Sequence, residues 1–96
     1  MKNILLCFPT KEDINNIKKY SGCVLKQGMA SVIPPCFSLS EIEDENIINQ
    51  SVSSLIWLCE EMWVFGKTIT DEMWKNIHKA KKINVNVRFI SDLEEA

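Results

Sequence analysis

Four short apolar runs that alternate with three helical patterns are the feature that most constrains the fold of this 96-residue chain. The first run, residues 3–8 (NILLCF), ends at Pro9, as expected of a strand covered on both faces. Further runs lie at 29–33, 62–65 and 85–90. A strand–helix–strand order implies right-handed crossovers, a parallel sheet and helices on both faces.

The segments between the runs carry helix signals. Thr10 to Asp13 resembles a capping box with Asp in place of Glu or Gln, and it precedes a helix predicted over 14–25 that Gly28 stops. A second helix is predicted to begin at Ser40 or one turn later at Asp44. Thr70 caps a third helix. The apolar stripes of the second and third helices are Ile48, Val52, Leu55, Ile56 and Cys59, and Met73, Ile77 and Ala80.

These elements predict one domain over residues 1–96, an α/β fold built as a three-layer α/β/α sandwich. Its four-stranded parallel sheet should have the order 2-1-3-4, with Leu5, Val32, Val64 and Val87 near its middle. In such folds ligands bind outside the carboxyl ends of the strands, where the strand order reverses. The residues predicted at that edge are Phe8, Pro9, Thr10, Pro34, Pro35, Gly66 and Lys67.

The composition and net charge limit the classes of partner that the chain is expected to bind. Apolar residues make up 46% and charged residues 25%, as is usual for a globular protein, and the net charge of −2 gives no overall attraction to nucleic acid or anionic lipid. No stretch approaches the roughly 20 apolar residues of a membrane span. The apolar start is too short for a secretory signal and lacks a cleavage site. We therefore expect a cytoplasmic protein with no membrane partner and no nucleic acid partner.

The cysteines do not indicate a metal site. They stand at positions 7, 23, 36 and 59 without a Cys-x-x-Cys pair, and the only histidine, His78, is far from all of them in sequence. We expect ordinary reduced thiols, no metal and no cofactor. His78 and the lysines of the third helix are read as solvated side chains; these lysines are Lys75, Lys79, Lys81 and Lys82.

Two segments resemble one known family. Residues 59–66 (CEEMWVFG) look like the "CDExWVFG" strand of small nucleoside 2-deoxyribosyltransferase-like proteins, and residues 69–80 (ITDEMWKNIHKA) follow that family's "I-S-x-G-M-x-x-E-I-x-x-A" helix. The first half agrees through a strand ending at Pro9, Asn16 on the first helix, Tyr20, Gly28 and then Ile33-Pro34. The resemblance implies a Rossmann-like or flavodoxin-like sandwich. It also implies cleavage of an N-glycosidic bond, in which a glutamate attacks the anomeric carbon of a nucleoside or nucleotide.

The departures from that pattern lie at the implied site. Asn76 stands where the family has its glutamate, and an amide has no anionic oxygen to attack with. Glu72 replaces the family's small glycine, and together with Asp71 it puts two negative charges where a phosphate would bind. Pro35 replaces a histidine that often follows the second strand. With Thr70 and Asn76 added to the sheet-edge residues, the site predicted by resemblance is a degenerate one.

Three functions follow from these observations. The leading hypothesis is a catalytically silent protein that binds a nucleotide-like ligand or a protein partner, such as a phage-type inhibitor or sponge that acts against a host defence system in the host cytoplasm. The first alternative is an active N-glycosidase or deoxyribosyltransferase that uses Asp71 or Glu72. The second is a structural protein with a vestigial pocket.

The three tryptophans bear on the core and on possible interfaces. Trp63 lies in a predicted buried strand and is assigned to the core, whereas Trp57 and Trp74 lie at the edges of helical stripes and are candidates for an interface. Relatives in the resembling family often assemble, with neighbouring chains completing each other's sites. A homodimer or larger homo-oligomer is therefore expected.

Overall fold

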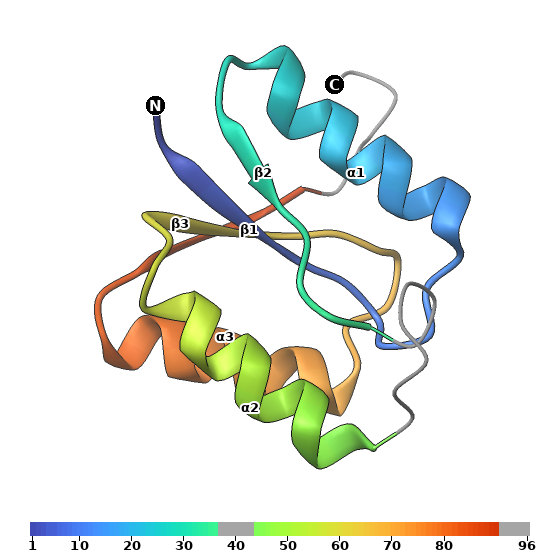
Figure 1. Cartoon of the computed structure of the whole chain (residues 1–96), viewed down its shortest axis with the longest axis vertical. Coiled ribbons are helices and arrows are strands. Elements are labelled where there is room, and N and C mark those ends of the chain that lie inside the picture. Colours follow the sequence, from blue (N-terminus) through green and yellow to red (C-terminus); the bar gives the residue numbers. More distant parts are fainter. Residues whose placement is uncertain (37–43, 91–96) are drawn as a thin grey trace.

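The computed structural model of the chain describes residues 1–36 and 44–90. Strands and helices alternate along the chain, as the sequence predicts (Figure 1). The elements are β1 (Asn3–Cys7), α1 (Ile14–Lys26), β2 (Ala30–Val32), α2 (Glu45–Ile56), β3 (Glu61–Val64), α3 (Asp71–Lys82) and β4 (Asn86–Phe89). Among these residues no helix has both the length and the apolar character needed to cross a membrane.

The sheet is four-stranded, in the order β2-β1-β3-β4. All three strand pairs are parallel, with Leu5 beside Val32 on one side and Met62 on the other. Helix α1 covers one face of the sheet, and α2 and α3 cover the other (Figure 1). The predicted α/β fold, its parallel pairing and its strand order are confirmed.

Strand β1 supplies both core layers because successive side chains of a strand point to opposite faces. Ile4 and Leu6 pack in the layer under α1, whereas Leu5 and Cys7 pack in the layer under α2 and α3. Each of these four side chains is at most 5% exposed. Val64 is equally buried near the sheet centre, but Val32 and Val87 are only half-buried because they lie on the two edge strands.

The helix starts follow from capping side chains, with one correction to the prediction. Asp13, not Thr10, caps α1: its carboxylate accepts from the backbone N–H of Asn15 at 2.7 Å. Thr10 instead lies in a turn closed by the Glu12 N–H donating to the Pro9 carbonyl at 3.0 Å. Asp44 caps α2, the later of the two predicted starts, while Ser40 lies outside the described residues. Thr70 caps α3, as predicted, with its hydroxyl accepting from Met73 N–H.

Helix α2 ends at Ile56, so Cys59 lies beyond it and not on its stripe, although the thiol is still buried. Trp63 is fully buried, as predicted. The four cysteines are all buried, and none of them forms a disulfide. Gly28 and Gly66 have positive φ angles of 78° and 113° at the predicted helix stop and strand exit, which favours glycine at both positions.

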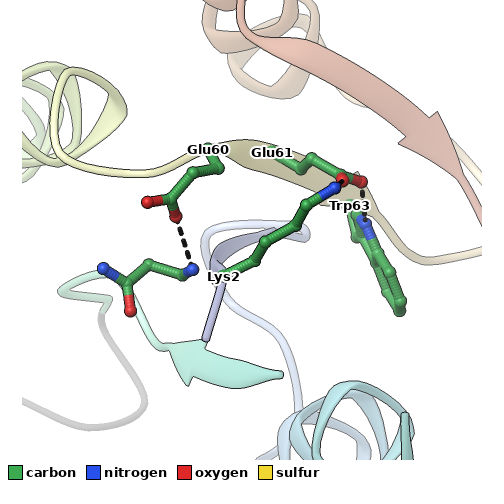
Figure 2. Close-up of polar contacts among 5 residues, drawn as sticks. Lys2, Glu60, Glu61 and Trp63 are labelled. Carbon is green, nitrogen blue, oxygen red and sulfur yellow. Dashed lines mark hydrogen bonds and ion pairs between the residues drawn. The ribbon is translucent and has the colours of Figure 1, made fainter. Parts of the chain in front are cut away.

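Polar contacts fasten the amino ends of β1 and β3 together (Figure 2). The Glu61 carboxylate accepts from Trp63 Nε1 at 3.0 Å and from Lys2 Nζ at 2.9 Å, and Glu60 accepts from the Asn3 backbone N–H. The hydrogen bond from Trp63 and the pairing with Lys2 lower the pKa of Glu61. This cluster lies at the amino edge of the sheet, opposite the edge where a ligand is expected.

Candidate functional site

A depression lies at the carboxyl end of β1, between that strand and the two helices α2 and α3. Its volume is about 20 Å³, or about 370 Å³ when the space open to solvent is included. It is lined by four sheet residues, called its floor, namely Leu5, Leu6, Cys7 and Met62. The lining residues from loops and helices, called its rim, are Phe8, Thr10, Pro34, Asn49, Val52 and Asn76. The position agrees with the rule for ligand sites in open parallel sheets.

Asn76 lies where the sequence places it. The α3 residues Met73, Ile77 and Ala80 are buried against the sheet, and Asn76 flanks this stripe by one residue. Its side chain is half-buried and lines the depression. A neutral amide residue therefore lines the depression at the position where the resemblance implies a glutamate.

Asn49 is the polar rim residue that was not predicted from the sequence. Helix α2 buries Ile48, Val52 and Ile56, and Asn49 flanks this stripe as Asn76 flanks that of α3. In the sequence Asn49 is visible only as a polar residue next to an apolar stripe, and its place in the depression depends on how α2 packs. The two helices face the depression with matching amides, because both pack on the same face of the sheet (Figure 1).

Four of the predicted edge residues line the depression, namely Phe8, Thr10, Pro34 and Asn76. The other predicted residues do not line it. Pro9 packs near Gly66, where an added Cβ would lie 3.5 Å from the proline ring, so the ends of β1 and β3 approach closely there. Pro35 and Lys67 are exposed, and Thr70 is occupied in capping α3.

The two acids at the start of α3 are not part of the rim. Asp71 is exposed and Glu72 is half-buried, and neither lines the depression. Both lie in the first turn of α3, where negative side chains complement the positive end of the helix dipole. This geometry gives no support to either carboxylate as an attacking group.

The depression is electrically neutral along its described lining. Its polar side chains are Thr10, Asn49 and Asn76, and burial raises the pKa of the Cys7 thiol to about 12, so the thiol is uncharged at neutral pH. Uncharged groups that both donate and accept hydrogen bonds suit a neutral polar ligand better than an anion.

A second polar cluster, not predicted from the sequence, lies where the chain leaves β1 and enters α1. Glu12 accepts from the Tyr20 hydroxyl at 2.8 Å, from Asn16 Nδ2 at 3.1 Å and from the Asp13 N–H at 2.9 Å. Burial favours the neutral acid, but these hydrogen bonds outweigh it and lower the pKa of Glu12. The ring of Tyr20 stacks on Phe65 with centroids 4.6 Å apart. The cluster fixes the turn that carries Thr10 to the rim.

Residues 2–90 match the family model described as a domain of unknown function, DUF7768. The chain belongs to this family. The matched region includes every described strand and helix, so the depression belongs to the DUF7768 domain itself. No curated protein and no solved structure matches the chain.

The described part of this DUF7768 domain contains no group of three or more His, Cys, Asp or Glu side chains placed to hold a metal ion. What the depression offers is an apolar floor with three neutral polar side chains around it. Such a surface can orient a small polar molecule by hydrogen bonds, and no carboxylate lies in its described lining.

Proposed function

We propose that the chain binds a small, neutral, nucleoside-type ligand in the depression without cleaving it. The observation that carries this proposal is the amide of Asn76 on the rim, at the position where the resembling family has a catalytic glutamate. An amide can hydrogen-bond to a sugar hydroxyl or a base edge, but it cannot form the glycosyl ester on which glycosidic cleavage by that family depends. Such a protein would sequester its ligand and not consume it.

Three polar side chains would orient the ligand. Asn49 and Asn76 reach the rim from neighbouring helices and each can donate and accept, while Thr10 adds a hydroxyl from the turn after β1. The enclosed 20 Å³ holds little more than one water or one hydroxyl group. The rest of the ligand would lie in the open part of the depression, and its apolar face would contact Phe8 and Pro34.

Charge favours a nucleoside over a nucleotide. A helix start usually attracts phosphate through its free N–H groups, but α3 begins with Asp71 and Glu72. These two carboxylates would repel a phosphate that approached the depression from that side. We therefore expect monophosphates to bind more weakly than the corresponding nucleosides.

The small enclosed volume favours a second candidate, a structural protein whose pocket is vestigial. Ligand pockets usually measure about 300–1,000 Å³ and enclose most of their ligand. Here the enclosed space is about 20 Å³. If the helices α2 and α3 do not move apart, a nucleoside can be contacted only at the surface.

Calorimetry with 2′-deoxynucleosides, their 5′-monophosphates and free bases would test the proposal, with chromatography of the same mixtures to detect released base. We expect saturable binding of at least one nucleoside, no released base above buffer, and binding weakened about tenfold or more by Asn76→Ala or Asn49→Ala, since each removes a polar contact. Lys75→Ala, a change at the exposed neighbour of Asn76, is the matched control and should bind as the unchanged protein does.

Each outcome of this experiment decides between the functions. Failure of every compound to bind would leave the structural candidate. Base release that survives Asn76→Ala and disappears in Asp71→Asn or Glu72→Gln would establish the enzyme instead. Binding that the two asparagine variants leave unchanged would refute this depression as the site.

A further inference from the structure

Strand β4 leaves one edge of the sheet open in the described structure. It pairs only with β3 among the described strands, and the Ile90 N–H that follows it donates inward to the Val64 carbonyl at 2.9 Å. Because backbone polar groups of a strand alternate between its two edges, those of Val87 and Phe89 point outward. An open edge of this kind is a template for pairing with another strand.

The side chains along this edge are apolar on one face. Val85 and Val87 pack partly against the core under α2 and α3, and Phe89 continues the same face. Phe89 remains 46% exposed and its ring contacts Trp74 of α3, with centroids 6.2 Å apart. Trp74 is itself 41% exposed, so an aromatic surface flanks the open edge.

Strand β4 carries little of the protection that is usual for an edge strand, apart from its short length of four residues. Natural edges are often guarded by a charged side chain or a proline, and β4 (NVRF) contains no proline. Its one charge is Arg88, whose guanidinium lies 4.7 Å from the centroid of the Trp63 ring, on the opposite face of the sheet. Arg88 is thereby directed toward its own sheet and away from the open edge.

Helix α3 carries an ordered charge pattern beside this edge. Asp71, Trp74, His78 and Lys82 are exposed at helical spacing and so lie along one face. Acids occupy the first turn of the helix, whereas lysines occupy the last. Two such helices packed antiparallel would place the acids of one against the lysines of the other.

We propose that β4 and α3 form a twofold interface with a second copy of this chain. The β4 strands would pair antiparallel around Val87, which would join the two sheets into one. The Val87 N–H of each chain would donate to the Val87 carbonyl of the other, and each Phe89 N–H would donate to the Val85 carbonyl of the other.

This register is the one that fits the side chains. A twofold axis perpendicular to the sheet keeps the faces of the two copies aligned. One residue must therefore pair with the same residue of the other copy, and the axis lies midway between these two residues. Centring on Val87 places Val85 opposite Phe89 on the apolar face, and Asn86 opposite Arg88 on the other face. Centring on Arg88 would place two like charges opposite each other, which is unfavourable.

The same axis makes the α3 helices antiparallel neighbours, with Asp71 and Glu72 of one copy facing the lysines near Lys82 of the other. The strand edge, the aromatic surface and the charge order are thus each self-complementary, which is what a twofold contact requires. A nucleic acid or an anionic membrane would instead require a surface of one sign, and α3 presents both.

Sedimentation equilibrium of the whole chain over a range of concentrations tests this interface. We expect a reversible dimer whose dissociation constant rises at least about tenfold in Phe89→Lys, because this change puts a charge into the centre of the contact. Asp71→Lys and Lys82→Glu should each weaken the dimer, and the two changes combined in one chain should restore it. Circular dichroism of each variant verifies that the monomer remains folded.

Trp57→Lys is the matched control, since Trp57 is 72% exposed just beyond α2 and lies outside the proposed interface. It should leave the dimer unchanged. A chain that remains monomeric at all concentrations would overturn the proposal. So would an oligomer that Phe89→Lys and the single charge reversals leave intact.

Discussion

Replacing Tyr20 with phenylalanine should destabilise the fold in a pH-dependent way. The change retains the ring that stacks on Phe65 and removes only the hydroxyl that donates to Glu12 at 2.8 Å. A hydrogen bond to a charged group contributes about 1.5–3 kcal/mol, and we expect the lower end because the contact is only part-buried. A loss of about 1.5 kcal/mol would lower Tm by about 6–12 °C in a domain of this size.

The sign of the pH dependence follows from Glu12. Its pKa in the folded protein lies below the ordinary value of 4.5, since hydrogen bonds from Asn16, Tyr20 and Asp13 outweigh the opposing effect of burial. A carboxylate of this kind contributes stability above its unfolded pKa, and the contribution is lost as the pH falls through the folded pKa. The penalty of Tyr20→Phe should therefore be full at pH 7 and shrink toward pH 3.

Urea unfolding of both proteins, followed by tryptophan fluorescence at pH 7 and at pH 3, measures this penalty. Ser21→Ala is the matched control, because it removes a neutral 2.8 Å hydrogen bond between Ser21 and Ser31 from the same helix. It should cost about 1 kcal/mol at both pH values. If Tyr20→Phe cost the same at pH 3 as at pH 7, the charged hydrogen bond would not be the source of its stability.

Three further predictions test other parts of the structure. Asp13→Ala should cost about 1 kcal/mol in urea unfolding and Thr10→Ala less than about 0.5 kcal/mol, since Asp13 caps α1; the reverse order would restore Thr10 as the cap. The four buried cysteines should react with a thiol reagent at pH 8 at least about 100-fold more slowly in buffer than in denaturing urea, because burial also raises the pKa of Cys7 and Cys59; equal rates would contradict their burial. Glu61→Gln should lower the urea midpoint at pH 7 and lower it less as the pH falls toward 3, because the stability contributed by a carboxylate with a lowered pKa is lost as the pH falls through its folded pKa; an equal drop at both pH values would argue against the ion pair with Lys2.

The sheet could be predicted from the sequence because its central strands are buried on both faces. An almost continuous apolar run such as residues 3–8 has few other structures open to it, and the helical spacing between runs requires parallel crossovers. The exact ends of the strands could not be predicted as well. Phe8 and Phe65 are buried core residues just beyond the ladders, so apolar character alone extends β1 and β3 by one residue.

The cap of α1 and part of the lining of the depression could not be predicted from the sequence. Thr10 and Asp13 are both good capping residues, and only the turn closed between Pro9 and Glu12 assigns the cap to Asp13. Asn76 could be placed from the stripe on its own helix. Asn49 required the packing of α2 beside α3, and the contact from Glu12 to Tyr20 depends on how the chain enters α1.

The central position of β1 matters for folding while the chain is being synthesised. Its two neighbours are β2 and β3, and roughly 60 residues separate the end of β1 from the end of β3. At a synthesis rate of about 5–20 residues per second, the most apolar strand of the protein waits several seconds for its second partner. During that interval β1 lacks one of its two neighbouring strands, and the side chains of Ile4, Leu5 and Leu6 are not yet fully covered. This nascent segment could be protected by a chaperone or by keeping neighbouring nascent chains apart. We expect such protection to influence the yield of folded protein more than the stability of the finished domain does.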